Sequence, residues 1–268
     1  MENNPIKTKY VRSPAAKIFA EPIAILRDII ARQLAKTGIT PNVLTVLGTI
    51  FAIIGAYFLA IGGEQSWADG KIPCPFYAGI FFFLACAMDM LDGALARIGN
   101  LHTQFGGILD SILDRISDMA IFGGIALCYA RIHNLTFTAL ALVALSNAVI
   151  ISYIKARTEC ELPSGTIGFW QRGERMAAIL IASFAAHINT LTWMMALLPA
   201  LSAIYRLHFS YMQTKNPDYK PAPPTGTLTF WRYPRGAWPC VIPTAAYILT
   251  LVLIKLPAPD FLSHLFNP

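Results

Sequence analysis

Four aspartates lie inside or beside two apolar segments, in positions where carboxylates could hold metal ions. Asp89 and Asp92 follow the run FYAGIFFFLACA, and Asp110 and Asp114 precede the run ISDMAIFGGIALCYA. The members of the first pair are three residues apart and those of the second pair four, so each pair shares one face of a helix. A carboxylate in hydrocarbon is energetically costly, and such residues usually mark a functional site.

Carboxylates that converge in one pocket need positive charge, because like charges in a medium of low dielectric repel each other. Mg²⁺ prefers oxygen ligands and keeps positions for water and phosphate, so the pattern predicts two Mg²⁺ or Mn²⁺ ions that hold a phosphoryl group. Gly93 and Gly106 would let a ligand approach the backbone. Arg97 could bind a diphosphate through two hydrogen bonds. The alternative is a proton or cation pathway, or acids neutralised by Arg97 and Arg115; Asp118 is expected to pair with Arg115.

The composition predicts the environment of these residues. Of 268 residues, 55% are hydrophobic and 13% are charged, and the mean hydropathy is +0.52. A soluble domain carries about 25% charged residues, so the chain is expected to be an all-α integral membrane protein. The polar, basic first forty residues lack the apolar core of a cleavable signal peptide. The five cysteines show no metal-binding spacing. The net charge of +6 is attributed to cytoplasmic loops and anionic lipids, with no nucleic-acid partner.

The apolar segments predict the helices that must position the aspartates. A membrane-spanning helix needs roughly 20 apolar residues. Six transmembrane helices are expected at 41–62, 76–97, 106–131, 135–157, 174–188 and 190–207. A further apolar stretch, 239–257, could add a helix that spans, re-enters or lies at the interface.

Before the first span, apolar and basic residues alternate with helical spacing over 13–39, which predicts an amphipathic helix on the membrane surface. A soluble cap helix is the alternative there. The expected organisation is an N-terminal segment (1–38), a six-helix domain (39–210) and a C-terminal extension (211–268) without an assigned role.

Basic residues predict the orientation in the membrane. They concentrate before the first span, between the second and third, between the fourth and fifth, and after the sixth, whereas the opposite loops hold little beyond Lys71 and Arg131. Positively charged loops stay in the cytoplasm. The protein is therefore expected in the cell (inner) membrane, with the aspartates facing the cytoplasm.

Residues 89–114 match D-x2-D-G-x2-A-R-x8-G-x3-D-x3-D at every position. This resembles the signature of the CDP-alcohol phosphotransferase family, and ITPNVLTVLG (39–48) is similar to the family's first-helix segment. The resemblance covers 20–210. It implies six transmembrane helices, a homodimer, and transfer of a substituted phosphate from a CDP-linked donor such as CDP-diacylglycerol to an alcohol, with release of CMP.

The resemblance also implies roles for particular residues. The metal ligands would be Asp89, Asp92, Asp110 and Asp114, and Asp114 would also act as the general base that removes the proton of the alcohol. The donor nucleotide would be bound by Asn42, Thr45, Gly93, Arg97 and Thr103.

Further basic residues bear on the acceptor alcohol. Cations at membrane depth need anionic partners, and a phosphate on the acceptor would supply one. SYIKAR followed by GER resembles the prokaryotic phosphatidylinositol phosphate synthase subgroup, which implies an inositol phosphate acceptor bound by Ser152, Lys155, Arg175 and Arg206. Arg157 and Arg172 are instead expected to extend to the lipid headgroups.

Two departures from this subgroup are the long loop GGEQSWADGKIPCP and the C-terminal extension. The same chemistry on glycerol 3-phosphate, serine or inositol is an alternative. So is a divalent-cation transporter, although that function predicts acids spread across the membrane depth. Here the acids cluster on one side.

Overall fold

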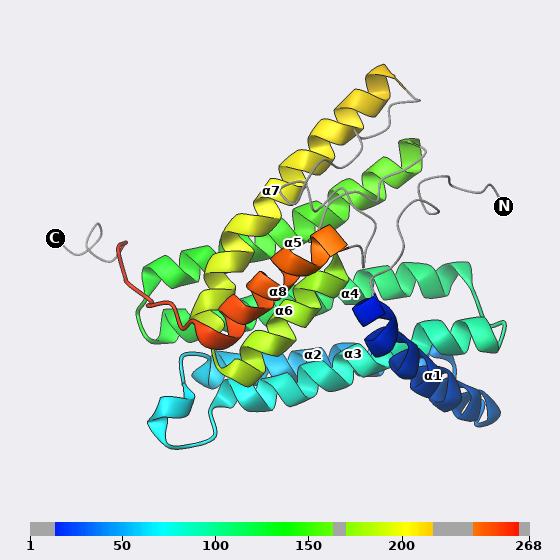
Figure 1. Cartoon of the computed structure of the whole chain (residues 1–268), viewed down its shortest axis with the longest axis horizontal. Helices are drawn as coiled ribbons and strands as arrows, with labels where there is room; N and C mark the ends of the chain where they lie inside the picture. The colour runs from blue at the N-terminus through cyan, green and yellow to red at the C-terminus, as the bar shows by residue number, and fades with distance from the viewer. Residues whose placement is uncertain (1–13, 163–169, 217–237, 263–268) are drawn as a thin grey trace.

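The structure is a computed structural model that describes residues 14–162, 170–216 and 238–262, and these residues form a bundle of α-helices (Figure 1). No described residue forms a β-strand, which confirms the all-α prediction. The helices are α1 (Pro14–Lys36), α2 (Pro41–Gly62), α3 (Cys74–Ile98), α4 (Gln104–Arg131), α5 (Leu135–Glu161), α6 (Arg172–Ala185), α7 (Ile188–Lys215) and α8 (Trp238–Leu253), and a single 3₁₀ turn, Trp67–Asp69, precedes α3.

Local signals in the sequence set several helix boundaries. Pro41 occupies the first turn of α2, where its missing N–H costs no hydrogen bond. The Oγ1 of Thr103 accepts a hydrogen bond from the N–H of Gly106 at 2.9 Å and caps the start of α4. Asn134 caps α5 in the same way by accepting from the N–H of Phe137 at 3.0 Å.

Four of the described helices, α2, α3, α5 and α7, are long and apolar enough to cross a membrane. The stretch 104–118 of α4 carries three aspartates and Arg115, which lowers the hydropathy of this helix. Helix α6 has 14 residues, or about 21 Å at 1.5 Å per residue, short of the roughly 30 Å of a hydrocarbon core. Length and composition thus support a membrane protein with four candidate spans.

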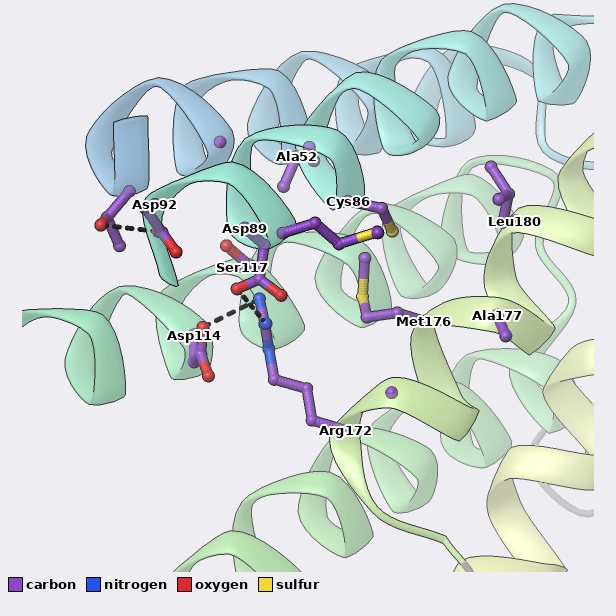
Figure 2. A pocket seen from close by; sticks show the side chains of 15 residues that line it. Ala52, Cys86, Asp89, Asp92, Asp114, Ser117, Arg172, Met176, Ala177 and Leu180 are labelled. Atoms are coloured by element: carbon purple, nitrogen blue, oxygen red, sulfur yellow. Dashed lines mark hydrogen bonds and ion pairs between the residues drawn. The ribbon is translucent and has the colours of Figure 1, made fainter. Parts of the chain in front are cut away.

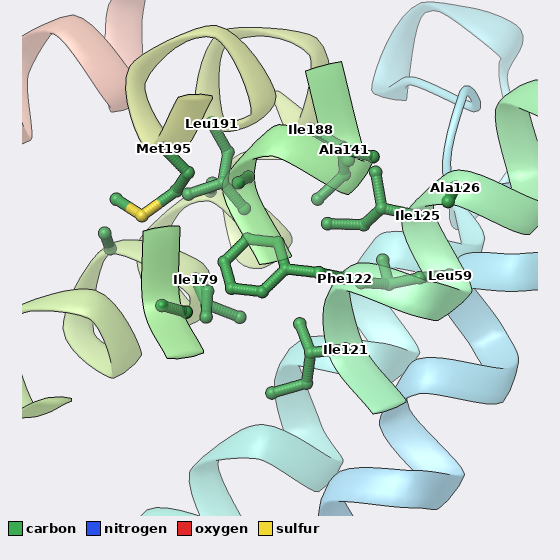
Figure 3. Packing of buried hydrophobic residues seen from close by; sticks show 14 of the residues in the cluster. Leu59, Ile121, Phe122, Ile125, Ala126, Ala141, Ile179, Ile188, Leu191 and Met195 are labelled. Atoms are coloured by element: carbon green, nitrogen blue, oxygen red, sulfur yellow. The ribbon is translucent and has the colours of Figure 1, made fainter. Parts of the chain in front are cut away.

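One hydrophobic core connects the helices that lead to the aspartates. Helix α2 packs on α3 and α4, α4 packs on α5, α5 packs on α7, and α6 packs on α3, α7 and α8. Figure 3 shows Leu59 of α2, Phe122 of α4, Ala141 of α5, Ile179 of α6 and Leu191 of α7 meeting in this core. All five are at most 1% exposed, so the core fixes the relative positions of these helices.

A second, smaller core joins α1 to the end of α3 that carries aspartates. Ala31 of α1 packs with Leu44, Leu91 and Leu95, which are all buried. Other apolar side chains of α1, including Ile25, are exposed. Helix α1 therefore supports the apolar face of the same helix turns that present Asp89 and Asp92 on another side.

The stretch predicted at 239–257 forms α8, which lies along α6 (Figure 1), followed by an extended segment. Hydrogen bonds attach this segment to the ends of helices remote from the aspartates. The Oγ1 of Thr190 donates to the carbonyl of Ile254 at 2.6 Å, and the Nδ2 of Asn134 donates to the carbonyl of Ala258 at 2.9 Å. The Oγ1 of Thr136 donates to Asp260 at 2.9 Å. The described part of the C-terminal extension is thus joined to the bundle.

Candidate active site

Three of the four predicted aspartates form one group of oxygen ligands. Asp89 and Asp92 lie near the end of α3, and Asp110 lies near the start of α4, after a short connection between the helices. One carboxylate oxygen from each residue lies within 4.8 Å of the other two. This donor set fits a divalent cation that prefers oxygen ligands. Asp114, one turn further along α4, is outside the group.

Helix α2 holds one of these carboxylates in place. The Oγ1 of Thr45 donates a hydrogen bond to Oδ2 of Asp92 at 2.8 Å. Asp92 is only 8% exposed, so an unpaired oxygen there would be costly. Thr45 was predicted to line the nucleotide pocket, and its observed partner is a candidate metal ligand.

Arg172, at the start of α6, points into the group of acids (Figure 2). Its Nη1 donates to Oδ1 of Asp89 at 2.8 Å, and its Nη2 forms an ion pair with Oδ1 of Asp114 at 2.9 Å. The expectation that Arg172 extends to the lipid headgroups is therefore wrong. Because α6 packs against α3, the first turn of α6 faces the aspartates.

A second ion pair lies one helical turn further along α4 and α6. The Nη2 of Arg175 donates to Oδ2 of Asp118 at 2.6 Å, and the two side chains are 1% and 3% exposed. The expected pairing of Asp118 with Arg115 is wrong, since the guanidinium of Arg115 instead donates to the carbonyl of Ser111 in its own helix. Asp118 is directed toward α6 because it follows Asp114 by four residues on the same face of α4.

Four of the five predicted nucleotide residues line a cavity of about 190 Å³ between α2, α3 and α4. They are Asn42, Thr45, Gly93 and Thr103, and Asp92 and Asp110 lie on the same wall. Arg97 does not line this cavity, but its Nη1 lies 3.5 Å from the point that a Cβ at residue 93 would occupy.

Because Gly106 has no side chain, α4 can lie close to Asn42 and Thr103 on this cavity. A Cβ there would lie 2.8 Å from Oγ1 of Thr103 and 3.0 Å from Oδ1 of Asn42. Both distances are shorter than ordinary van der Waals contact. His102 also lines the cavity, and the sequence analysis missed it; its position next to Thr103 was the available signal.

All four predicted acceptor residues line a second cavity, of about 270 Å³. Ser152 and Lys155 come from α5, Arg175 from α6 and Arg206 from α7. The same cavity is lined by Asp110 and Asp114, and also by Arg172 and Asp118. The structure therefore brings the basic residues of three helices to the carboxylates of α4.

A third cavity, of about 430 Å³, extends from the acids into an apolar region between α2, α3 and α6 (Figure 2). Asp89, Asp92, Asp114 and Arg172 line its polar part. Its other walls are mostly apolar, and include Gly48, Ala52, Ala85, Cys86, Met176, Ala177 and Leu180. A molecule with a charged head and an apolar chain would match this cavity.

The comparisons with known proteins agree with this arrangement. The sequence model of CDP-alcohol phosphatidyltransferases matches residues 38–205, more than half of the chain. The chain belongs to the CDP-alcohol phosphatidyltransferase family. This family membership confirms the resemblance that the aspartate motif indicated.

Individual family members show which proteins the chain is similar to. It is 34% identical over 192 residues to phosphatidylinositol phosphate synthase of Mycobacterium tuberculosis (strain ATCC 25618 / H37Rv), covering 67% of this chain and 82% of that protein. It is 35% identical over 181 residues to archaetidylinositol phosphate synthase of Pyrococcus horikoshii, covering 67% of this chain and 87% of that protein.

Solved structures show the same relationship. A crystal structure of the Mycobacterium tuberculosis phosphatidylinositol phosphate synthase with CDP-DAG bound matches with a TM-score of 0.61 and 30% identity, over 73% of this chain and 98% of that one. Another crystal structure of that synthase, in complex with manganese and citrate, matches with a TM-score of 0.60 and 30% identity, over 76% of this chain and 97% of that one. The family fold thus accounts for most of the described bundle.

Proposed function

We propose that this chain transfers the phosphatidyl group of CDP-diacylglycerol to a hydroxyl of inositol phosphate, which gives phosphatidylinositol phosphate and CMP. The observation that carries the proposal is the cavity that joins Asp114 to Ser152, Lys155, Arg175 and Arg206. A phosphate on the acceptor would bring an anion to the cavity that these cations line, whereas a neutral acceptor such as serine or inositol would not.

The relatives support the same acceptor. The names of the mycobacterial and archaeal relatives differ in the lipid and share inositol phosphate. The acceptor is therefore the part of the reaction on which these relatives agree. The donor is supported by the third cavity, whose polar end and apolar walls suit a lipid with a charged headgroup.

The chemistry assigned to the chain's own residues is a proton transfer and a displacement. Asp114 removes the proton from the acceptor hydroxyl, whose oxygen attacks the β-phosphorus of the donor. The bond between that phosphorus and the oxygen of CMP breaks, and CMP leaves. Arg97 stabilises the diphosphate, and Asn42, Thr45, Gly93 and Thr103 bind the nucleotide.

The carboxylates of Asp89, Asp92 and Asp110 would hold a divalent cation, and Asp114 would complete a site for two. Bound Mg²⁺ or Mn²⁺ would supply positive charge to the phosphoryl oxygens. The donor set supports this assignment, because three carboxylate oxygens within 4.8 Å of one another repel each other unless a cation lies between them.

The proposed setting is the cell (inner) membrane, with the active site facing the cytoplasm. In this arrangement α2 to α7 provide six spans around the catalytic region 39–210, α1 lies in the interface, and the chain forms a homodimer. The exposed apolar side chains of α1, such as Ile25, Leu26 and Ile29, support contact with lipid. The extension 211–268 has no assigned chemistry.

The test is CMP release by the purified full chain in detergent, with CDP-diacylglycerol and Mg²⁺. Inositol 3-phosphate, inositol, glycerol 3-phosphate and serine are supplied in separate reactions, and the Asp114→Asn variant is the blank. We expect release with inositol phosphate alone. Release with another alcohol would keep the role of the aspartates and refute the acceptor. No release with any of them would refute all four acceptors and leave another acceptor, another donor or cation transport.

A further inference from the structure

We propose that Asp118 is a positioning residue for the acceptor site, because it fixes Arg175 and the first turns of α6 against α4. The inference rests on the proposed function, since it assigns the cavity lined by Arg172 and Arg175 to the phosphate of the acceptor. Asp118 is outside the aspartate motif and would not touch the reacting atoms.

The two ion pairs between α4 and α6 form a ladder. On α6, Arg172 and Arg175 are three residues apart, and on α4, Asp114 and Asp118 are four apart, so each set lies on one helix face. Arg172 pairs with Asp114, and Arg175 pairs with Asp118. The match of the two spacings sets how α6 is aligned along α4.

The two pairs differ in how easily they can exchange partners. The side chains of Arg172 and Asp114 are 26% and 22% exposed, whereas those of Arg175 and Asp118 are 1% and 3% exposed. A partly exposed pair can separate when a ligand or a metal ion replaces one partner. A buried pair cannot separate without leaving an uncompensated charge. The Arg175–Asp118 pair is therefore the fixed one, and the Arg172–Asp114 pair is the one that substrate binding can open.

The two helices also meet in the hydrophobic core, through Phe122 of α4 and Ile179 of α6, but their backbones are not closely packed. Among the described helices, those packed closely on α6 are α3, α7 and α8, and α4 is not one of them. At the start of α6, the ion pairs are the polar contacts that hold the arginines beside Asp114 and Asp118. Without Asp118, Arg175 would lose its carboxylate partner, and the start of α6 would lose its buried attachment to α4.

The arginines still have hydrogen-bond donors for a ligand. Within the part of the chain that the structure describes, the buried Nε atoms of Arg172 and Arg175 have no hydrogen-bond partner. Both residues line the cavity that Asp114 also lines. Guanidinium N–H groups held at fixed positions suit the oxygens of a phosphate. Asp118 would thus hold these N–H groups in position to donate hydrogen bonds to the phosphate of the acceptor.

The test separates this role from a contribution to stability alone. KM and kcat are measured for inositol phosphate at saturating CDP-diacylglycerol, and for the donor at saturating acceptor, together with the melting temperature. In Asp118→Asn we expect the acceptor KM to rise about tenfold or more, as for loss of a charge-assisted hydrogen bond. The donor KM should stay within about twofold, because Asp118 does not line the nucleotide cavity. Asp118→Glu, which keeps the charge, should recover part of the loss.

A double variant tests whether the buried ion pair is structural only. Asp118→Leu with Arg175→Met replaces the buried ion pair by apolar side chains, which usually restores stability. We expect the melting temperature to recover while the acceptor KM remains raised. Recovery of both would overturn the inference, since the pair would then be structural only. So would an unchanged acceptor KM in Asp118→Asn.

Two controls complete the design. Glu161→Gln removes the carboxylate partner of an exposed arginine, Arg157, and should leave both KM values unchanged. Phe137→Leu weakens the core near the opposite helix ends and should lower the melting temperature alone. If the wild type releases no CMP with inositol phosphate, the proposed function fails, and this inference fails with it. If the wild type releases CMP with inositol phosphate and Asp118→Asn keeps the wild-type acceptor KM, this inference alone fails.

Discussion

Replacing Arg172 by glutamine should make the substrate-free protein bind divalent cations more tightly. In the structure Arg172 is the cation that neutralises two acids, through contacts of 2.8 Å to Asp89 and 2.9 Å to Asp114. Asp89 is also one of the three clustered carboxylates. A metal ion at this cluster would bind the carboxylate that Arg172 already contacts, so we expect Arg172 and the metal to compete for Asp89.

The magnitude follows from the geometry and exposure of that contact. A hydrogen bond to a charged group contributes about 1.5–3 kcal/mol when buried. The side chains of Arg172 and Asp89 are 26% and 44% exposed, so solvent screening reduces this contribution to about 1 kcal/mol. Since 1.4 kcal/mol is tenfold in affinity, we expect the dissociation constant for Mn²⁺ to fall by about fivefold.

The assay is Mn²⁺ titration of the detergent-solubilised protein without substrates, followed by electron paramagnetic resonance of the free ion. Arg157→Gln is the matched control, because Arg157 pairs with Glu161 on an exposed face of α5 and should leave the affinity unchanged. CMP release by Arg172→Gln should fall even though the metal binds more tightly, since Arg172 lines both the cavity of about 270 Å³ and the cavity of about 430 Å³. An unchanged or weaker Mn²⁺ affinity would refute the competition.

Three further predictions concern the metal and nucleotide sites. Asp89→Asn should weaken Mn²⁺ binding by about tenfold or more, because a neutral amide replaces one charged ligand of the cluster, and an unchanged Mg²⁺ dependence of CMP release would exclude that role. Chelation with EDTA should abolish CMP release and restored Mg²⁺ should recover it, whereas activity in excess EDTA would rule out a required metal. Gly106→Ala should weaken binding of a CDP-linked donor and lower the melting temperature, because the added Cβ would lie 2.8 Å from Oγ1 of Thr103; calorimetry against Phe137→Leu separates the two effects.

The parts of the fold that could be predicted from the sequence depend on neighbouring residues. Apolar length and the positions of Pro41 and Thr103 located the helix starts to within a few residues, because caps and hydropathy act locally. The end of α7 was missed, since the helix continues to Lys215 and the predicted span stopped at 207. The group of Asp89, Asp92 and Asp110 was also predictable, since two spacings place acids on single faces and a short connection makes α3 and α4 neighbours.

The remaining features depend on contacts between distant segments. The cavity of about 430 Å³ is lined by small residues on three helices, such as Ala52, Ala85 and Ala177, and no one helix shows a pattern for it. The attachment of the C-terminal segment pairs Asn134 with the carbonyl of Ala258 across 124 positions. Such contacts follow from how helices pack, which local sequence does not specify.

The wrong expectation for Arg172 follows from the predicted start of its helix. The helix was predicted to begin at 174, which left Arg172 in a loop. In the structure α6 begins at Arg172, so Arg172 and Arg175 are three residues apart on one helix face. The structure places both on the cavity. The carboxylate partner of each, by contrast, was beyond local reasoning, because it depends on how α6 lies against α3 and α4.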